Sequence, residues 1–301
     1  MSDKIIIYVL RLLAKLPLGL AQQLGGILGR LSYLFASEQK RIARINIALC
    51  LPELDQKERN RLLRESLIEN ARTLVEMPSM WSGDPSRWIE KIELADGSQE
   101  VLEEALSLNK GLIVAGPHLG NWELGPHYLS TFIKTTALYK PPKVHAVEEM
   151  MTLGRSSSGS ELVPTTTKGV RALYSALARS EAILVFCDQE PSMGGKQGGI
   201  YAPFFGNRAS TMVLVNRLAK KSAAPVLFWF AERLPNGRGF RMHWLPAPDG
   251  IVDEDSAVSA TALNRGLEQC VRIQPAQYLW SYKRFRTQPD QTPNIYSRPD
   301  C

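Results

Sequence analysis

A histidine and a glutamate five residues apart, His118 and Glu123, follow the end of an apolar segment. The segment, residues 111–116 (Gly-Leu-Ile-Val-Ala-Gly), reads as a strand, and Pro117 ends it directly before the histidine. On a straight helix this spacing would place the two side chains about 140° apart, but Gly120 favours a bend that brings them together. A carboxylate bonded to one imidazole nitrogen leaves the other nitrogen basic. We therefore predict a His118–Glu123 general base that activates an alcohol or amine for group transfer without a protein nucleophile.

The residues around this pair resemble the His-x4-Asp/Glu block of the glycerolipid and lysophospholipid acyltransferase superfamily. The sharper pattern His-x-Gly-Asn-Trp-Glu, at residues 118–123, is similar to the branch that contains the lipid A biosynthesis lauroyl and myristoyl acyltransferases. Further segments agree with that branch, in its order, within residues 40–290: Leu138-Tyr139-Lys140, Arg155, Asp188-Gln189-Glu190-Pro191, Pro203-Phe204-Phe205-Gly206, Ala209-Ser210-Thr211, Pro275-Ala276-Gln277-Tyr278-Leu279-Trp280 and Lys283-Arg284-Phe285.

The resemblance implies an acyltransferase that needs no cofactor and works at the cytoplasmic face of a bacterial inner membrane. Its donor would be an acyl-carrier-protein thioester and its acceptor a hydroxyl of a phosphorylated lipid A precursor. Another lipid acceptor (a lysophospholipid, an ornithine lipid or a glycolipid), a thioesterase or esterase, and a non-catalytic membrane adaptor stay open as alternatives. A transferase and a hydrolase differ in the molecule that receives the acyl group, which is the acceptor lipid in the first and water in the second.

Six residues beside the pair are candidates for substrate binding: Asn121, Trp122, Arg155, Asp188, Gln189 and Phe205. The guanidinium of Arg155 would suit a phosphate of the lipid or of the carrier's phosphopantetheine arm, if it is not simply a solvated loop residue. Asp188 and Gln189 end an apolar strand, where they either face the substrate or cap the next turn. The other three would shape a turn, a pocket wall or an acyl groove, although aromatic residues such as Phe205 are more often core.

Metal and cysteine chemistry are not indicated. His118, Glu123 and His127 could be three ligands, but Pro126 interrupts them and no His-Glu-x-x-His spacing is present, so we predict no metal site. The four cysteines show no Cys-x-x-Cys spacing, as expected for thiols in a reducing cytoplasm. Cys187 is the nearest rival nucleophile, and it has no recognisable histidine partner.

The N-terminal segment is apolar and basic. Residues 1–50 hold seven Lys and Arg against two acidic residues, which gives them +5 of the net charge of +6. Lys4, Arg11 and Lys15 would share one face of a helix, a pattern typical of a helix lying in an anionic membrane interface. The longest uncharged run, residues 16–29, is 14 residues long and therefore short for a membrane span. A helix packed on the soluble core and a short tilted span stay open, and no motif points to nucleic acid.

The hydrophobic pattern predicts an α/β fold, with a central mixed sheet covered by helices on both faces. We divide the chain into a membrane-associating helical segment, residues 1–36, and an acyltransferase domain, residues 37–301. Strands are expected at residues 91–94, 112–115, 136–139, 182–187, 225–230 and 240–245. Helices are expected at residues 38–49, 55–76, 98–108, 123–133, 145–153, 167–179, 211–221 and 257–273. Residues 155–160 and 191–199 are expected as mobile loops flanking the site.

Overall fold

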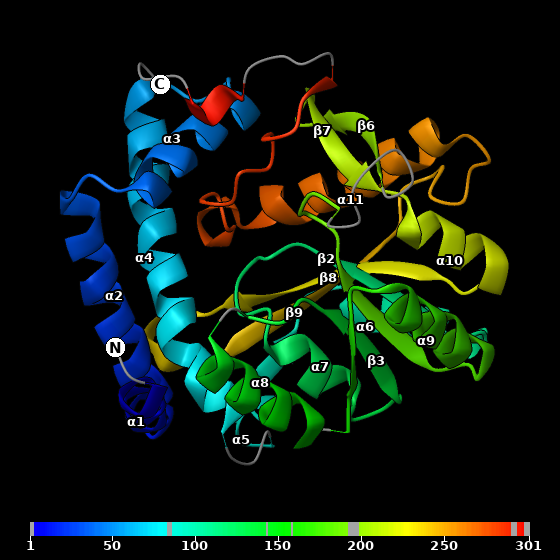
Figure 1. Ribbon diagram of the computed structural model, residues 1–301, viewed down its shortest axis with the longest axis horizontal. Helices are drawn as coiled ribbons and strands as arrows, with labels where there is room; N and C mark the ends of the chain where they lie inside the picture. The colour runs from blue at the N-terminus through cyan, green and yellow to red at the C-terminus, as the bar shows by residue number, and fades with distance from the viewer. Residues whose placement is uncertain are drawn as a thin grey trace.

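A seven-stranded mixed sheet forms the centre of the computed structural model (Figure 1), which describes residues 3–82, 86–142, 144–157, 159–191, 199–289 and 294–297. The strand order is β1-β9-β8-β2-β5-β3-β4, and only the β8–β9 pair is antiparallel. Their bounds are β1 Ile92–Leu94, β2 Leu112–Gly116, β3 Thr135–Tyr139, β4 Glu161–Pro164, β5 Ala182–Phe186, β8 Val226–Arg233 and β9 Phe240–Pro246.

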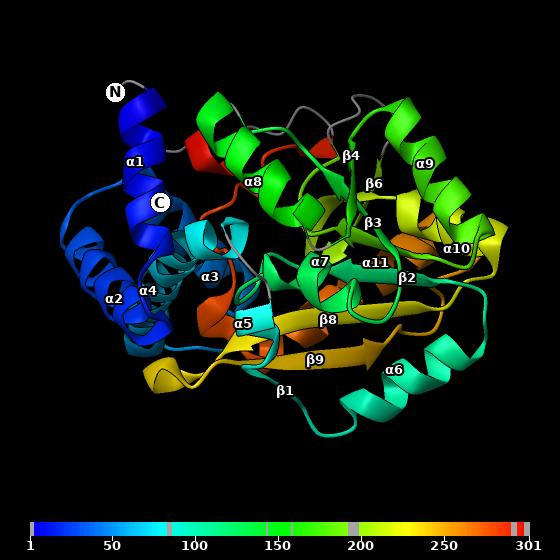
Figure 2. The ribbon, with the colours of Figure 1, turned by 90° about the horizontal axis from the view of Figure 1, so that it is seen from below.

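Helices cover both faces of this sheet, so the predicted α/β layering is confirmed (Figure 2). Alternate residues of β2 enter two separate cores, Leu112 and Val114 on one face and Ile113 and Ala115 on the other, as the two-residue period of a strand requires. The first face packs against α6 (Ser98–Ser107), α7 (Leu124–Leu129) and α8 (His145–Ser157). The second packs against α9 (Thr167–Ala178), α10 (Leu214–Ser222) and α11 (Ser256–Ile273).

Four helices precede the sheet in the chain and stand along one side of it in Figure 1. They are α1 (Asp3–Ala14), α2 (Leu18–Leu34), α3 (Glu38–Cys50) and α4 (Gln56–Trp81), and a short helix, α5 (Ser86–Ile89), follows. Asp55 caps α4 as predicted and forms a capping box with Glu58. The helix continues past Pro78 to Trp81, five residues beyond its predicted end, which brings its last turns against the sheet.

Helix α2 packs tightly on α4. A Cβ on Gly25 or Gly29 would lie 2.5 Å from the Cα of Arg72 or Ile68, respectively, so only glycine permits this approach. No helix among the described residues is both long and apolar enough to cross a membrane. The membrane association of residues 1–36, and the domain boundary after them, stay predictions.

A two-stranded antiparallel hairpin, β6 (Gly199–Phe204) and β7 (Asn207–Met212), was not predicted. Its turn residues Phe205 and Gly206 both have positive φ, 47° and 74°, as a tight hairpin turn requires. Residues 211 and 212 therefore belong to a strand, and the helix expected from residue 211 begins at Leu214. Strand β4 was also missed.

Two further expectations were wrong in their bounds. Residues 155–157 form the last turn of α8 rather than a loop, and the helix expected over residues 123–133 is the shorter α7. Of the second expected loop, residues 192–198 lie outside the described residues.

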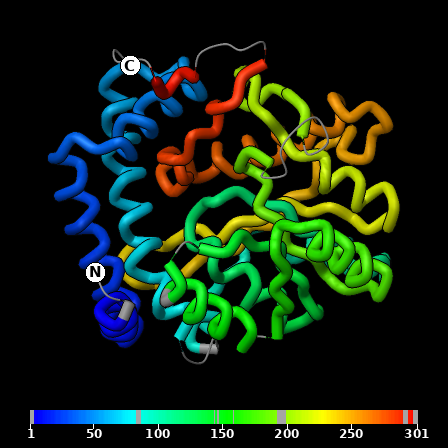
Figure 3. The backbone as a smooth tube through the Cα atoms, viewed as in Figure 1, coloured from blue at the N-terminus to red at the C-terminus, as the bar shows by residue number. Residues whose placement is uncertain are grey.

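After α11 the chain passes through short 3-10 turns, η2 (Pro275–Gln277) and η4 (Ile295–Ser297), and returns to α3 (Figure 3). Arg41 donates to the carbonyl of Tyr296, and the Tyr296 hydroxyl donates to Asn46, at 2.6 Å each. Leu279 N–H in turn donates to the carbonyl of His118, so this returning segment supports the predicted site.

Candidate active site

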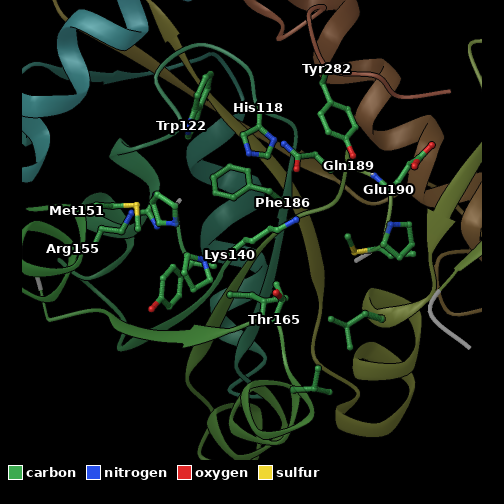
Figure 4. Close-up of a pocket in the computed structure, with 18 of the residues that line it drawn as sticks. His118, Trp122, Lys140, Met151, Arg155, Thr165, Phe186, Gln189, Glu190 and Tyr282 are labelled. Atoms are coloured by element: carbon green, nitrogen blue, oxygen red, sulfur yellow. Dashed lines mark hydrogen bonds between the residues drawn. The ribbon is translucent and has the colours of Figure 1, made fainter. Parts of the chain in front are cut away.

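A pocket of about 850 Å³ opens at the edge of the sheet where β2, β3, β4 and β5 all end (Figure 4). These strands run parallel, so the residues that follow them meet at one edge, the usual site position in α/β sheets. The described residues that line the pocket are His118, Trp122, Leu138, Tyr139, Lys140, Pro141, Pro142, Met151, Arg155, Thr165, Val170, Phe186, Gln189, Glu190, Pro191, Met212, Leu214, Tyr282 and Arg286.

The imidazole of His118 is held by Asp188, two residues after β5. Nδ1 of His118 lies 2.7 Å from one carboxylate oxygen, and the backbone N–H of the same histidine donates to the other oxygen at 2.9 Å. A carboxylate only accepts, so Nδ1 carries the proton and the lone pair is on Nε2. The histidine side chain is 18% exposed and lines the pocket, whereas the aspartate side chain is 3% exposed. This arrangement makes Nε2 the nitrogen available to a substrate.

The predicted contact between His118 and Glu123 is not what the structure shows. The Glu123 carboxylate accepts from Arg155 at both oxygens, at 2.6 and 2.9 Å, and from the indole N–H of Trp81 at 2.8 Å. No hydrogen bond joins the two side chains of the predicted pair among the residues described. The spacing argument failed because the chain bends after β2 so that the glutamate faces α4 and α8, while the neighbouring strand supplies the aspartate.

Both carboxylates are buried, and both are held ionised. Burial alone would raise the pKa of Asp188, but its electrostatic interaction with the His118 imidazole and the two hydrogen bonds from this residue keep that pKa below its ordinary value. Burial likewise acts to raise the pKa of Glu123, and the charge and hydrogen bonds of Arg155, with the bond from Trp81, hold it low. The acid next to the histidine is therefore a permanent acceptor, and the other is half of a buried ion pair.

Aromatic rings enclose the imidazole. The ring of Phe186 lies 4.7 Å from that of His118 between centroids, and the ring of Trp122 meets it edge-on at 5.3 Å. Figure 4 shows these two rings beside the histidine, with Tyr282 on the opposite side. The prediction that Trp122 forms part of the pocket wall agrees with this position.

A buried network fixes the turn after His118. A Cβ on Gly120 would lie 1.9 Å from the carbonyl oxygen of Ala231, so no other residue fits there. Asn121 donates to Glu76 at 2.8 Å, and the guanidinium of Arg233 bonds both oxygens of that glutamate at 2.7 Å. These contacts hold the turn that bears His118 between α4 and the end of β8.

Three of the predicted substrate-binding residues take other roles. Asn121 is fully buried in the network above, and Asp188 holds the histidine. Phe205 packs on Phe204 and Trp280 in the hydrophobic core and is not among the described pocket residues, because the unpredicted hairpin turn directs it there.

Gln189 and Arg155 do line the pocket, as predicted, but Arg155 is a buried helix residue paired with Glu123 rather than a loop residue. Cys187 is excluded as a nucleophile, since it is completely buried and burial raises the pKa of its thiol. Among the described residues, no group of three or more His, Cys, Asp and Glu side chains could hold a metal ion. The absence of a metal requirement stays a prediction.

Sequence reasoning missed the partner of the histidine, although a usable signal was present. Asp188 is a polar residue directly after an apolar strand, and β5 is the neighbour of β2 in the sheet. Parallel strands bring the residues after their carboxyl ends together, so pairing the two strand ends would have found this contact. The Glu76–Arg233 pair had no comparable signal, because its members are 157 residues apart.

Comparison with known proteins identifies the family of the chain. Residues 2–287 match the profile of the family described as bacterial lipid A biosynthesis acyltransferase. The chain is 26% identical to a lipid A biosynthesis lauroyltransferase of Escherichia coli, over 96% of this chain and 92% of the relative. It is 29% identical to a palmitoleoyltransferase of the same organism over the same shares, and 23% identical to its myristoyltransferase over 91% and 83%. The chain therefore belongs to the bacterial lipid A biosynthesis acyltransferase family and is an acyltransferase.

Proposed function

We propose that this enzyme transfers a fatty acyl chain from an acyl-carrier-protein thioester to a hydroxyl group of a lipid A precursor. The observation that carries the proposal is the His118–Asp188 pair at the pocket, in which Nδ1 of the histidine is occupied and Nε2 is the nitrogen left to act as a base. The similarity of the whole chain to lauroyl-, palmitoleoyl- and myristoyltransferases of lipid A supports the acceptor class.

In the reaction, Nε2 of His118 takes the proton of the acceptor hydroxyl as its oxygen attacks the thioester carbonyl carbon. The imidazolium that forms is stabilised by ionised Asp188, which is hydrogen-bonded to Nδ1. The tetrahedral intermediate then expels the thiolate, and the proton passes from Nε2 to the departing sulfur. An ester bond forms, a thioester bond breaks, and no covalent acyl-enzyme is needed.

The rest of the pocket suits a long acyl chain. Its walls combine aromatic and aliphatic side chains, among them Leu138, Met151, Val170, Phe186 and Leu214. Burial of methylene groups against such walls stabilises a bound chain by roughly 0.8 kcal/mol each. Among the predicted residues, we retain Trp122 and Gln189 as substrate contacts, and we assign Glu123 to holding Arg155 in the wall.

The decisive variant is His118→Ala. Removal of a general base should lower turnover by a factor on the order of 10²–10⁴ while the fold is kept. Acyl transfer from the carrier thioester to the lipid precursor would be followed by mass spectrometry, with His145→Ala, an exposed histidine that does not line the pocket, as the matched control. Near-normal turnover in a folded His118→Ala protein would overturn the mechanism.

The same assay separates the alternative functions. A thioesterase would release free fatty acid at equal rates with and without the lipid acceptor, because water would take the acyl group. A transferase for another acceptor would acylate a lysophospholipid, ornithine lipid or glycolipid in preference to the lipid A precursor. We expect the lipid A precursor to be the preferred acceptor and hydrolysis to be the minor reaction.

We also propose that α1 lies on the cytoplasmic face of the bacterial inner membrane. Apolar residues at spacings of three and four are exposed along this helix: Ile5, Tyr8, Val9 and Leu12. Exposed basic residues accompany them: Lys4, Arg11 and Lys15. A helix with this pattern binds by burying its apolar face while cations near the surface contribute about 1 kcal/mol each with anionic lipid.

Charge reversal tests the membrane proposal. The variant Lys4→Glu/Arg11→Glu/Lys15→Glu should bind anionic vesicles much more weakly than the wild type and should bind neutral vesicles nearly as well, as measured by flotation. Deletion of residues 1–36 is a poorer test, since it would uncover the face of α4 on which Gly25 and Gly29 pack. Unchanged binding of the reversed variant to anionic vesicles would contradict the proposal.

A further inference from the structure

Three cationic side chains line the pocket among its described residues, and they differ in their partners. Arg155 faces both oxygens of Glu123, and Arg286 lies 3.0 Å from Glu190. Lys140 has no hydrogen bond or ion pair to any described residue, although it lines the same pocket. Its charge is therefore the one that is not balanced by a carboxylate within the described part of the pocket.

The backbone directs Lys140 into this pocket. It follows β3 directly, and Pro141 and Pro142, which both line the pocket, come after it. A residue before proline is confined to extended conformations, so the strand before Lys140 and the proline after it both restrict its backbone. Figure 4 shows its side chain extending into the pocket toward the side where Gln189 and Glu190 lie.

The distance from the reacting histidine follows from the sheet. Lys140 follows β3 and His118 follows β2, with β5 between them. Two strand spacings separate the two positions by about 10 Å. Lys140 and His118 therefore enter the same pocket from different strand ends, and a substrate that reaches the histidine also passes the lysine.

We propose that Lys140 binds a phosphate group of the substrate. An ammonium is a compact charge that binds phosphate as a point charge, and an uncompensated cation in a pocket favours an anionic ligand. The proposal rests on the proposed function, in which both substrates offer this chemistry. The phosphate is either that of the lipid precursor or that of the carrier's phosphopantetheine arm. Phosphate binding, which was predicted for Arg155 from the sequence, is thereby assigned to Lys140.

The kinetic experiment uses Lys140→Met, which removes the charge and keeps an apolar stem, and Lys140→Arg, which keeps the charge. Each is assayed with acyl-phosphopantetheine against acyl-pantetheine as donor, and with the phosphorylated against the dephosphorylated lipid precursor as acceptor. We expect Lys140→Met to raise KM for the phosphate-bearing substrate by about 10–100-fold and to change kcat little, since the lost contact is to a charged group. The Arg variant should stay near wild type.

If removing the phosphate from one substrate abolishes the difference between Lys140→Met and wild type, that substrate is the source of the phosphate. Lys110→Met, an exposed lysine before β2 at the opposite edge of the sheet, is the matched control and should change neither parameter. An equal loss with phosphorylated and dephosphorylated forms of both substrates, or no loss at all, would overturn the proposal.

Binding in the absence of turnover keeps this inference separate from the catalytic one. Calorimetric titration of His118→Ala with acyl-phosphopantetheine, and then with the phosphorylated precursor, reports affinity without chemistry. We expect the added Lys140→Met change to weaken one of the two titrations by about 10–100-fold. Such a result would hold even if the acyl acceptor proved to be another phosphorylated lipid, whereas equal affinities would reject the site even if catalysis by His118 were established.

Discussion

Two buried carboxylates flank the same turn, and they do different work. Asp188 comes from the neighbouring strand end and bonds the imidazole of His118, which opens on the pocket. Glu123 comes from the turn itself and forms a fork with Arg155 from α8. The Asp188 side of the turn therefore faces the pocket, and the Glu123 side holds the turn against the helices around it.

The difference shows that closeness in the chain is a weak guide to partnership in a site. Glu123 is five residues from the histidine, and Asp188 is seventy residues away. The short motif thus meets two requirements at once, the base of the proposed mechanism and an ion pair that holds the turn of this histidine in place. The following variants separate those requirements.

Asp188→Asn should have the largest effect. The amide can still accept from the backbone N–H of His118, but its NH2 group would donate to Nδ1 and force the proton onto Nε2, the wrong tautomer for a base. We expect kcat to fall by a factor on the order of 10²–10⁴ with the protein still folded, as measured by single-turnover kinetics and circular dichroism.

Full activity in a folded Asp188→Asn protein would contradict this assignment. The histidine would then need another partner, and Glu123 would again be the candidate.

Glu123→Gln should act mainly on stability. It removes the carboxylate charge that the buried Arg155 guanidinium faces, and breaking a buried ion pair in this way costs about 3–5 kcal/mol in the free energy of unfolding. Turnover of the molecules that remain folded should fall less than tenfold, far less than in Asp188→Asn. Urea unfolding and activity per folded molecule measure the two effects separately.

The sign of the pH dependence follows from the lowered pKa of Glu123. Ionised Glu123 stabilises the native state above its ordinary pKa of 4.5, and this contribution is lost as the pH falls through the lower native value. The loss of stability on acidification should therefore be shallower in Glu123→Gln than in wild type. Removal of both charges in Glu123→Gln/Arg155→Met should recover part of the stability, whereas a double variant as unstable as the single one would argue against the ion pair.

The fold was largely predictable because its elements carry strong local patterns. The apolar runs of β2 and β5 and the amphipathic helices on both faces are visible in the sequence, and Asp55 marks the start of α4. The hairpin β6–β7 was not predictable in the same way. Its strands are partly exposed, and its turn depends on positive φ at Phe205, an unusual conformation for a phenylalanine.

The site was predictable only in part, for a related reason. Local residues identified His118 and the strand that delivers it, because both signals lie within a few positions of each other. The contacts that complete the site join distant segments, as Asp188 and Arg233 illustrate, and depend on strand order and side-chain direction. Lys140 was visible as a residue, but its lack of a partner among the described residues could be recognised only in the folded chain.

Thr73→Val should give the smallest effect and tests the buried side of the turn directly. The Thr73 hydroxyl accepts from Arg233 at 2.6 Å and lies 3.1 Å from the carbonyl of Gly120, two residues after the histidine. Valine keeps the shape and removes the hydroxyl, so the free energy of unfolding should fall by about 1–2 kcal/mol.

Activity in Thr73→Val should fall less than tenfold, because Glu76 still holds Arg233 and Asn121 and keeps the turn in place. Thr131→Val, at an exposed helix end, is the matched control and should change neither quantity. A loss of kcat as large as that of Asp188→Asn, without a loss of stability, would mean that the turn must be held far more tightly than the ion pairs alone require. The two sides of the turn would then act as one unit, and the separate roles assigned to Asp188 on one side and to Glu76 and Glu123 on the other would be contradicted.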